Sequence, residues 1–99
     1  MNYELLFTKE FTKIFEKLLK KNKKQAEIIL KKIREVKENP THYKPLNNKL
    51  KGYWRVHIDS SFVLVFAVRG NSIIIYDYDH HDNIYNKNFD TYSIQNSPQ

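Results

Sequence analysis

Three short segments in the second half of the chain decide the fold. Residues 53–78 read YWRVHIDSSFVLVFAVRGNSIIIYDY. The first seven of them alternate between apolar and polar or aromatic side chains, which is typical of a half-buried strand. Residues 62–68 are apolar on both faces and predict a central strand, and residues 73–78 predict a third. Because Ser, Gly and Asn separate the three segments, we expect tight turns and an antiparallel meander.

The first half of the chain has a helical period instead. Residues 3–7 predict a short first strand, and Thr8 is a suitable N-cap for a helix that follows it. Asn22 is a second N-cap candidate, and Asn39-Pro40 should end the second helix. Apolar residues recur at helical spacing in both segments. They are Phe11, Ile14, Phe15, Leu18 and Leu19 in the first, and Ala26, Ile29, Leu30, Ile33 and Val36 in the second.

These patterns predict a single α+β domain: an N-terminal strand, a helical hairpin and an antiparallel meander sheet. The hairpin should bury its apolar stripe on one face of the sheet, which leaves the face with Arg55 and His57 at least partly wet. Residues 1–86 form this domain in our interpretation. Residues 87–99 form a polar tail. We expect the chain from residue 86 onward to be loosely held, or ordered only by a partner.

The turn after the first meander strand sets a register. If Asp59 pairs with Phe62, then His57 lies opposite Leu64 and Arg55 opposite Phe66. In that arrangement the two basic side chains project from one face, because they are two residues apart on a strand. We expect them to stand on a floor of apolar side chains.

Composition excludes several classes of protein. The 99 residues contain no cysteine, so disulfides, thiolate catalysis and Cys-ligated metal sites are absent. The longest apolar run is too short to span a bilayer, and the N-terminus lacks the basic segment of a signal peptide. We therefore expect a cytoplasmic protein. Gly52 and Gly70 are the only glycines, so no P-loop, dinucleotide-binding or GxSxG motif is present.

The net charge of +6 is concentrated in the first half of the chain. Residues 9–51 carry fourteen basic and five acidic side chains. A basic field of this kind attracts polyanions, which could be nucleic acid, an acidic protein or an anionic membrane. The same lysines also fit a simpler interpretation, the solvated surface of a lysine-rich helical hairpin.

Four residues together suggest phosphodiester chemistry. Arg55 and His57 share a face, and His81 and Tyr85 follow the last strand, which antiparallel connectivity can return to that face. One imidazole can take a proton from a 2′-hydroxyl, another group can protonate the leaving 5′-oxygen, and arginine can neutralise the transition state. Tyr85 could stack on a base or donate a proton.

The same residues have other interpretations. Arg55 could be a surface arginine paired with Asp59, His57 a packed or exposed histidine, and His80-His81 a solvated strand exit. A metal site is a further alternative, although its spacing matches no known motif and its candidate ligands cannot all converge. These are Asp77, Asp79, His80, His81 and Asp82, with His57 as an additional nitrogen. We expect no metal or other cofactor.

The sequence resembles the RelE/ParE superfamily of type II toxins over about residues 1–86. Three stretches carry the resemblance to its RelE and YafQ-like branch: LKGYWRVHID (50–59), FVLVF (62–66) and DHHDNIY (79–85). The resemblance implies a toxin that enters the ribosomal A site and cleaves mRNA without metal. It also implies an acidic antitoxin partner. No membrane partner is expected.

The resemblance also suggests roles for individual residues. His57 falls where relatives place a catalytic histidine or lysine, Arg55 at a basic position of the same strand, and His81 at the C-terminal catalytic position. Tyr85 falls at the terminal aromatic. Three lysines would lie near the RNA backbone: Lys44, Lys49 and Lys51.

Three positions depart from the relatives. Asn48 stands where some have a histidine, Ser61 where some have an acid, and Val63 where RelE-type relatives have an arginine. These differences leave open which group is acid and which is base, and whether the toxin is fully active. Two other functions stay open: a ParE-like poison of DNA gyrase, and a non-catalytic module that binds RNA or an acidic protein.

Overall fold

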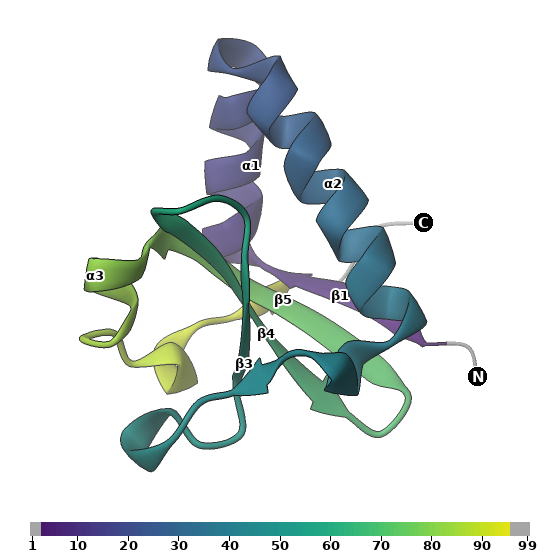
Figure 1. Ribbon diagram of the computed structural model, residues 1–99, viewed down its shortest axis with the longest axis vertical. Helices are drawn as coiled ribbons and strands as arrows, with labels where there is room; N and C mark the ends of the chain where they lie inside the picture. Colours follow the sequence, from purple (N-terminus) through teal and green to yellow (C-terminus); the bar gives the residue numbers. More distant parts are fainter. Residues whose placement is uncertain (1–2, 96–99) are drawn as a thin grey trace.

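The computed structural model describes residues 3–95, in which two helices stand on one face of a six-stranded sheet (Figure 1). The strand order is β2-β3-β4-β5-β1-β6. The element bounds are β1 (Glu4–Thr8), α1 (Lys9–Lys21), α2 (Lys23–Glu38), β2 (Lys44–Pro45), β3 (Trp54–His57), β4 (Phe62–Arg69), β5 (Ser72–His80), α3 (His81–Ile84) and β6 (Ile94–Gln95), with short 3-10 turns η1 (Pro40–His42), η2 (Asn48–Leu50) and η3 (Phe89–Thr91). The predicted α+β architecture is confirmed.

Strands β3, β4 and β5 form the predicted antiparallel meander. The first strand completes the sheet in a way that the periodicity did not predict: β1 lies beside β5 and runs parallel to it. No helix within residues 3–95 is long and apolar enough to cross a membrane.

The predicted helix boundaries are confirmed by their caps. The Thr8 hydroxyl accepts a hydrogen bond from the Phe11 amide at 3.0 Å, and the Asn22 side chain accepts one from the Gln25 amide at 3.2 Å. These side chains satisfy amide groups that the first turn of a helix leaves without partners. Helix α2 ends at Glu38, directly before Asn39-Pro40.

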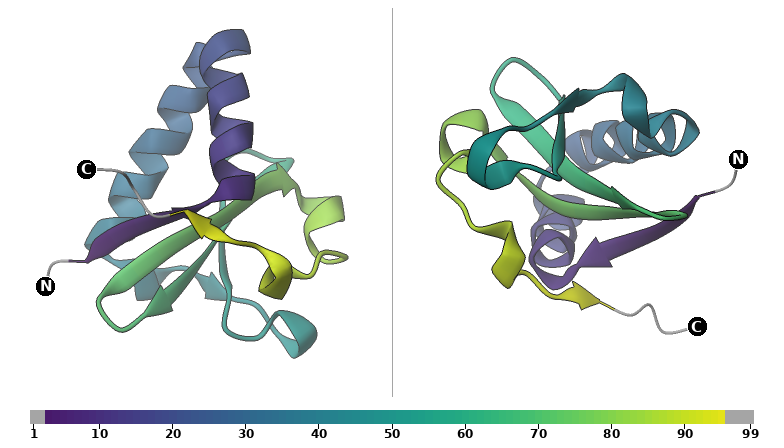
Figure 2. Two further views of the ribbon diagram at one scale, coloured as in Figure 1. Left: turned by 180° about the vertical axis from the view of Figure 1, so that it is seen from behind. Right: turned by 90° about the horizontal axis from the view of Figure 1, so that it is seen from below.

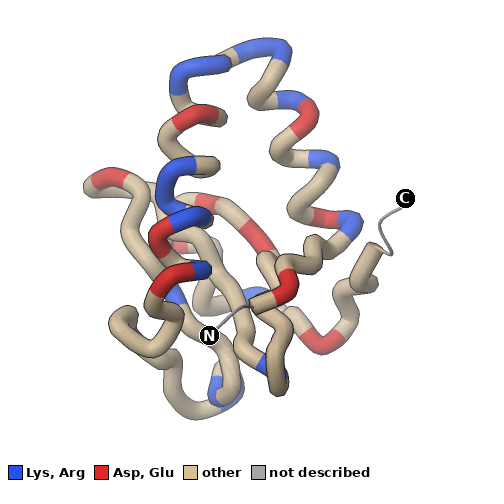
Figure 3. Tube along the Cα trace, turned by 90° about the vertical axis from the view of Figure 1, so that its right-hand side faces the viewer, with Lys and Arg blue, Asp and Glu red and all other residues tan. Residues whose placement is uncertain are grey.

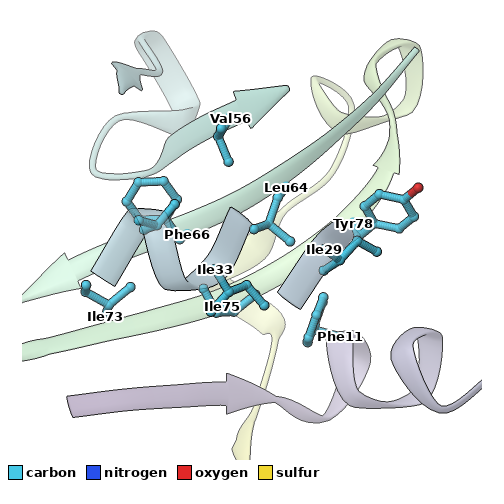
Figure 4. Close-up of a cluster of buried hydrophobic side chains, with 10 residues drawn as sticks. Phe11, Ile29, Ile33, Val56, Leu64, Phe66, Ile73, Ile75 and Tyr78 are labelled. Atoms are coloured by element: carbon cyan, nitrogen blue, oxygen red, sulfur yellow. The ribbon is translucent and has the colours of Figure 1, made fainter. Parts of the chain in front are cut away.

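The main core lies between the helical hairpin and the sheet (Figure 4). Phe11 from α1 and Ile29 from α2 meet Leu64 and Phe66 from β4, and these four side chains are buried. Burying each such side chain contributes about 1.5–3 kcal/mol. Most of both amphipathic stripes therefore packs where the spacing predicted, but Leu19 and Leu30 are exposed, at 46% and 37%.

A second core covers the opposite face of the sheet, which corrects our expectation for the tail. Phe89 is only 1% exposed and packs with Tyr53 and Tyr76, and β6 pairs antiparallel with β1 (Figure 2). Residues 86–95 are therefore held against the sheet, not loosely attached. The reason is that aromatic side chains spaced along this polar segment bury apolar surface that the helices leave open. Residues 96–99 lie outside the described residues.

The register of β3 differs from the prediction by one residue. His57 lies opposite Val63 and Arg55 opposite Val65, instead of Leu64 and Phe66. The cause is the turn, in which the Ile58 amide donates to the Phe62 carbonyl at 2.9 Å and the Asp59 amide only at 3.5 Å. The Asp59 carboxylate instead accepts the amides of Ser61 and Phe62 at 2.8 Å each. A slip of one residue exchanges the faces of a strand. The predicted apolar floor exists, but different residues form it.

Candidate functional site

The candidate site lies on the sheet face turned away from α1 and α2, which we call the second face. Directly opposed residues on neighbouring strands share a face. Register therefore places one row of side chains across four strands: Lys44, Arg55, Val65 and Asp77. A second row, nearer the β3–β4 turn, consists of His57, Val63 and Asp79. Two basic side chains, two carboxylates and a histidine thus surround a floor of two valines.

A β-bulge explains why both carboxylates reach this face. The register between β4 and β5 shifts between Val65 and Phe66, so that β5 contains one extra residue. Consequently Tyr76 and Asp77, although consecutive, both belong to the second face, while Ile75 and Tyr78 face the helices. Bulges redirect side chains in this way, often near functional sites.

The short helix α3 carries the two C-terminal residues of the predicted set to the same end of the sheet. The His81 amide donates to the Ser61 carbonyl at 2.8 Å, which fixes the start of α3 at the β3–β4 turn. Four residues later, the Tyr85 hydroxyl accepts a hydrogen bond from the Arg55 guanidinium. The guanidinium carbon also lies 5.9 Å from the centre of the Tyr85 ring.

The four predicted residues therefore form two neighbouring levels. His81 and Tyr85 are separated by one helical turn and share a face of α3. His57, the last residue of β3, and His81 lie at the end of the sheet that carries the β3–β4 turn. Arg55 and Tyr85 lie farther from this turn. Arg55 is half-buried, whereas His57 and Tyr85 are exposed to solvent. A ligand on this face could therefore meet two imidazoles, a guanidinium and a phenol.

Beside these residues is a polar cluster that sequence reasoning missed. The Lys87 ammonium lies 2.7 Å from a carboxylate oxygen of Asp77 and 2.7 Å from one of Asp79. Tyr92 donates to the same Asp77 oxygen at 2.7 Å. The sequence did contain a signal for this cluster. Asp77 interrupts an apolar strand, and a buried carboxylate needs a positively charged partner. Lys87 is the only Lys or Arg after Arg69 and was therefore the available partner in that part of the sequence.

Proton affinities in this cluster follow from its contacts. Burial acts to raise the pKa of Asp79, but hydrogen bonds from Lys87, the His80 amide and Asn83 outweigh it and hold this pKa below its ordinary value. Burial acts to lower the pKa of Lys87, and the two carboxylates reverse this and raise it. The Asp79–Lys87 pair is therefore charged over the physiological pH range.

Two of the three predicted lysines line depressions. One of about 240 Å³ has Lys44, Arg55 and Tyr85 in its wall, and a neighbouring one of about 380 Å³ has Lys49 and Lys87. Lys51 is exposed in the turn after η2 and lines neither of them. Positive groups thus border both depressions, which lie between β2 and the segment after α3.

Comparison with known proteins now identifies the family. The family model described as the ParE toxin of the type II toxin–antitoxin system parDE matches residues 2–85. A relative from Methanocaldococcus jannaschii with the provisional name toxin RelE4 is 51% identical over 87 residues, which cover 86% of this chain and 93% of the relative. The chain belongs to the RelE/ParE superfamily of type II toxins.

Solved structures show the same fold for this toxin. The YoeB–YefM complex from Staphylococcus aureus matches with a TM-score of 0.72 at 21% identity, covering 82% of this chain and 99% of that one. The RelBE2 toxin–antitoxin complex from Mycobacterium tuberculosis matches with a TM-score of 0.69 at 18% identity, covering 82% and 100%. At these identities the likeness concerns the fold.

The three positions at which the resemblance implied a departure lie around the same site. Val63 is part of the floor beside His57, and the Ser61 carbonyl holds the amide of His81. Asn48, with a positive φ of 60°, lines the depression that contains Arg55 and Tyr85. Substitutions here change groups near the candidate residues without removing them.

Only part of the metal site considered from the sequence comes together in the described residues. Asp77 and Asp79 are engaged by Lys87, and His57 is not in the group that the remaining candidates form. Within residues 3–95, one group of side chains has spacing suited to a metal ion: His80, His81 and Asp82.

Proposed function

We propose that this type II toxin is an endoribonuclease that cleaves mRNA in the ribosomal A site by metal-independent acid–base catalysis. The observation that carries the proposal is the grouping of Arg55, bonded to Tyr85, with His57 and His81 at one accessible end of the second face. No other element of the described chain gathers this combination of proton-transfer groups and a cation.

The reaction is an internal transfer of the phosphodiester. The 2′-oxygen of one nucleotide attacks its own 3′-phosphorus while one histidine, His57 or His81, accepts the 2′-hydroxyl proton. The bond from phosphorus to the 5′-oxygen of the next nucleotide breaks, and the other histidine donates a proton to that oxygen. The products are a 2′,3′-cyclic phosphate and a 5′-hydroxyl. Arg55 neutralises charge on the phosphoryl oxygens in the transition state.

Tyr85 and the lysines complete the proposed site. The Tyr85 hydroxyl holds the Arg55 guanidinium, and its exposed ring can stack on a base of the codon. Lys44, Lys49 and Lys51 supply positive charge for the RNA backbone. An acidic antitoxin is the proposed partner, supported by the basic surface and by relatives that were solved together with antitoxins.

The decisive experiment incubates purified toxin with mRNA-programmed ribosomes and maps cleavage by primer extension. We expect discrete A-site cuts that decrease by at least about 100-fold in His81→Ala, because loss of a general acid or base costs about 10²–10⁴-fold. His42→Ala, which changes an exposed histidine in η1, is the matched control and should cut normally. Unchanged cleavage by His81→Ala would remove His81 from the mechanism.

Inhibition of DNA gyrase is the second candidate, because the matching family model describes ParE of parDE. A gyrase cleavage assay with the same protein separates the two. Gyrase-dependent DNA breaks without ribosomal cuts would favour a gyrase poison. RNA binding with neither activity would favour a non-catalytic binding module.

A further inference from the structure

We propose that His80, His81 and Asp82 form a binding site for a divalent transition-metal ion, with zinc as the simplest occupant, and that the bound ion inhibits the toxin. The inhibitory part rests on the proposed role of His81, whereas the binding part stands on the geometry alone. The three side chains offer ligand atoms that all lie within 4.8 Å of one another.

The distances between these atoms resemble those of a tetrahedral site. The Nδ1 atoms of His80 and His81 lie 3.5 and 3.1 Å from different oxygens of the Asp82 carboxylate. Two ligands at about 2.0–2.1 Å from a tetrahedral zinc ion are separated by roughly 3.3 Å. The Asp82 carboxylate therefore already stands between two imidazole nitrogens at nearly the required spacing.

Contacts from β4 and its preceding turn hold the two rings in place. The ring of His80 packs edge-on against Phe62, with 5.6 Å between ring centres, and stacks on His81 at 4.8 Å. The His81 backbone is fixed by its bond to Ser61. Preorganised ligands lose less conformational freedom when the ion binds.

The hydrogen-bond geometry of the ligands also suits a metal. The His80 Nδ1 accepts the Asp82 amide at 3.2 Å, so this nitrogen carries a lone pair and not a proton. An ion would replace this long hydrogen bond. The His81 Nδ1 faces the Asp82 carboxylate at 3.1 Å, so it also points toward the proposed ion position. Both rings and the carboxylate remain open to solvent, which gives the ion a path of entry.

Occupancy would block the catalytic role of His81. The Nδ1 atom of an imidazole that is bound to zinc has its lone pair engaged, and the ring is held in one orientation, so His81 could not move to meet the RNA. His80 is separate from this chemistry, because it points toward Phe62 on the opposite side of β5 from Asp79. It therefore distinguishes metal binding from catalysis.

The binding test uses untagged full-length toxin and zinc chloride in isothermal titration calorimetry. We expect one zinc ion per chain, with affinity reduced about tenfold or more in His80→Gln and Asp82→Asn, because each variant removes one of three ligands. His42→Gln is the matched control and should bind as the wild type does. Absence of binding, or equal binding by all four proteins, would overturn the proposal.

The activity test adds zinc chloride to ribosomal cleavage reactions. Wild-type cleavage should fall as zinc saturates the site and return when a chelator is added, while His80→Gln should need about tenfold more zinc for the same loss. Zinc binding without loss of cleavage would overturn the inhibitory part. If the toxin cuts nothing even without zinc, the ribonuclease proposal fails, while the calorimetric result still decides the metal site.

Discussion

Lys87 shows how one residue can link the end of a chain to its functional face. Its ammonium contacts Asp77, which is only 1% exposed, and Asp79, which also accepts the Asn83 side chain from α3 at 3.2 Å. A carboxylate buried this deeply is costly without a positive partner. Lys87 therefore compensates the two carboxylates of β5 on the second face, and it holds the segment after α3 close to this strand.

Replacing Lys87 with Met tests this role. The substitution leaves Asp77 buried with only the Tyr92 hydroxyl and its neighbouring amide, so we expect the free energy of unfolding to fall by about 3 kcal/mol. Urea denaturation followed by circular dichroism measures the change. Lys37→Met, at an exposed position of α2, should change stability by less than about 0.5 kcal/mol. Adding Asp77→Asn to the Lys87→Met variant should recover part of the loss, and a stable single variant would contradict the assignment.

The carboxyls of Asp59 and Asp79 predict the pH dependence of stability. The hydrogen bonds from the Ser61 and Phe62 amides lower the pKa of Asp59, and the contacts with Lys87, His80 and Asn83 outweigh burial and lower that of Asp79. A carboxyl whose pKa is lower in the folded than in the unfolded state stabilises the fold when the pH is above the ordinary pKa of 3.8. This stabilisation is lost as the pH falls through the folded-state pKa.

We therefore expect the melting temperature to fall between about pH 4 and about pH 2, and Asp79→Asn to flatten this dependence. Melting curves of both proteins across this range provide the measurement. Identical slopes for the two proteins would mean that Asp79 has the same pKa in the folded and unfolded states.

At the scale of elements, the C-terminal segment acts as part of the sheet's second face. Phe89 in η3 fills the second core, Tyr53 donates to Asp90 at 2.7 Å, and β6 extends the sheet beside β1 (Figure 2). Because α3 precedes this segment directly, the packing of η3 and β6 also restrains the helix that carries His81 and Tyr85.

Phe89→Ala should therefore lower the free energy of unfolding by about 3–5 kcal/mol, since a buried aromatic ring is lost and a cavity remains. Ile94→Ala in β6 is the matched control: its side chain is 39% exposed, and the change should cost less than about 1 kcal/mol. Chemical denaturation of both variants measures the difference. Equal, small effects would show that the segment is not anchored through Phe89.

Across the whole molecule, positive charge occupies two separate regions. Four lysines, Lys20, Lys21, Lys23 and Lys24, gather at the end where α1 and α2 meet, away from the sheet (Figure 3). A second group borders the depressions of the second face: Lys44, Lys49, Arg55 and Lys87. Only the second group lies beside the candidate catalytic residues, so the two regions can be tested separately with RNA.

The salt dependence of RNA binding distinguishes these regions. For a single-stranded oligonucleotide, the combined change of Lys44, Lys49 and Lys51 to Ala should reduce the slope of log affinity against log salt by about 2, because each lost phosphate contact contributes about 0.7. Fluorescence anisotropy between low and moderate salt measures it. Lys23→Ala with Lys24→Ala at the hairpin end should leave the slope unchanged. The opposite pattern would place the RNA on the helices.

Much of the architecture was predictable from short stretches of sequence. The alternation in residues 53–59, the helical stripes, the caps at Thr8 and Asn22 and the stop at Asn39-Pro40 all correspond to observed elements. Arg55 and His57 could be placed on one face for the same reason. Such features depend on residues a few positions apart, whose geometry is set by the periods of helix and strand.

Other features were decided only in the folded molecule. The turn at Asp59 moved the register by one residue, the bulge in β5 turned Asp77 and Asp79 toward the second face, and Lys87 met them from the tail. The parallel pairing of β1 with β5 joins residues almost seventy positions apart. Local periodicity carries no information about such contacts, because they depend on which of several compact arrangements buries the most apolar surface while leaving each charge a partner.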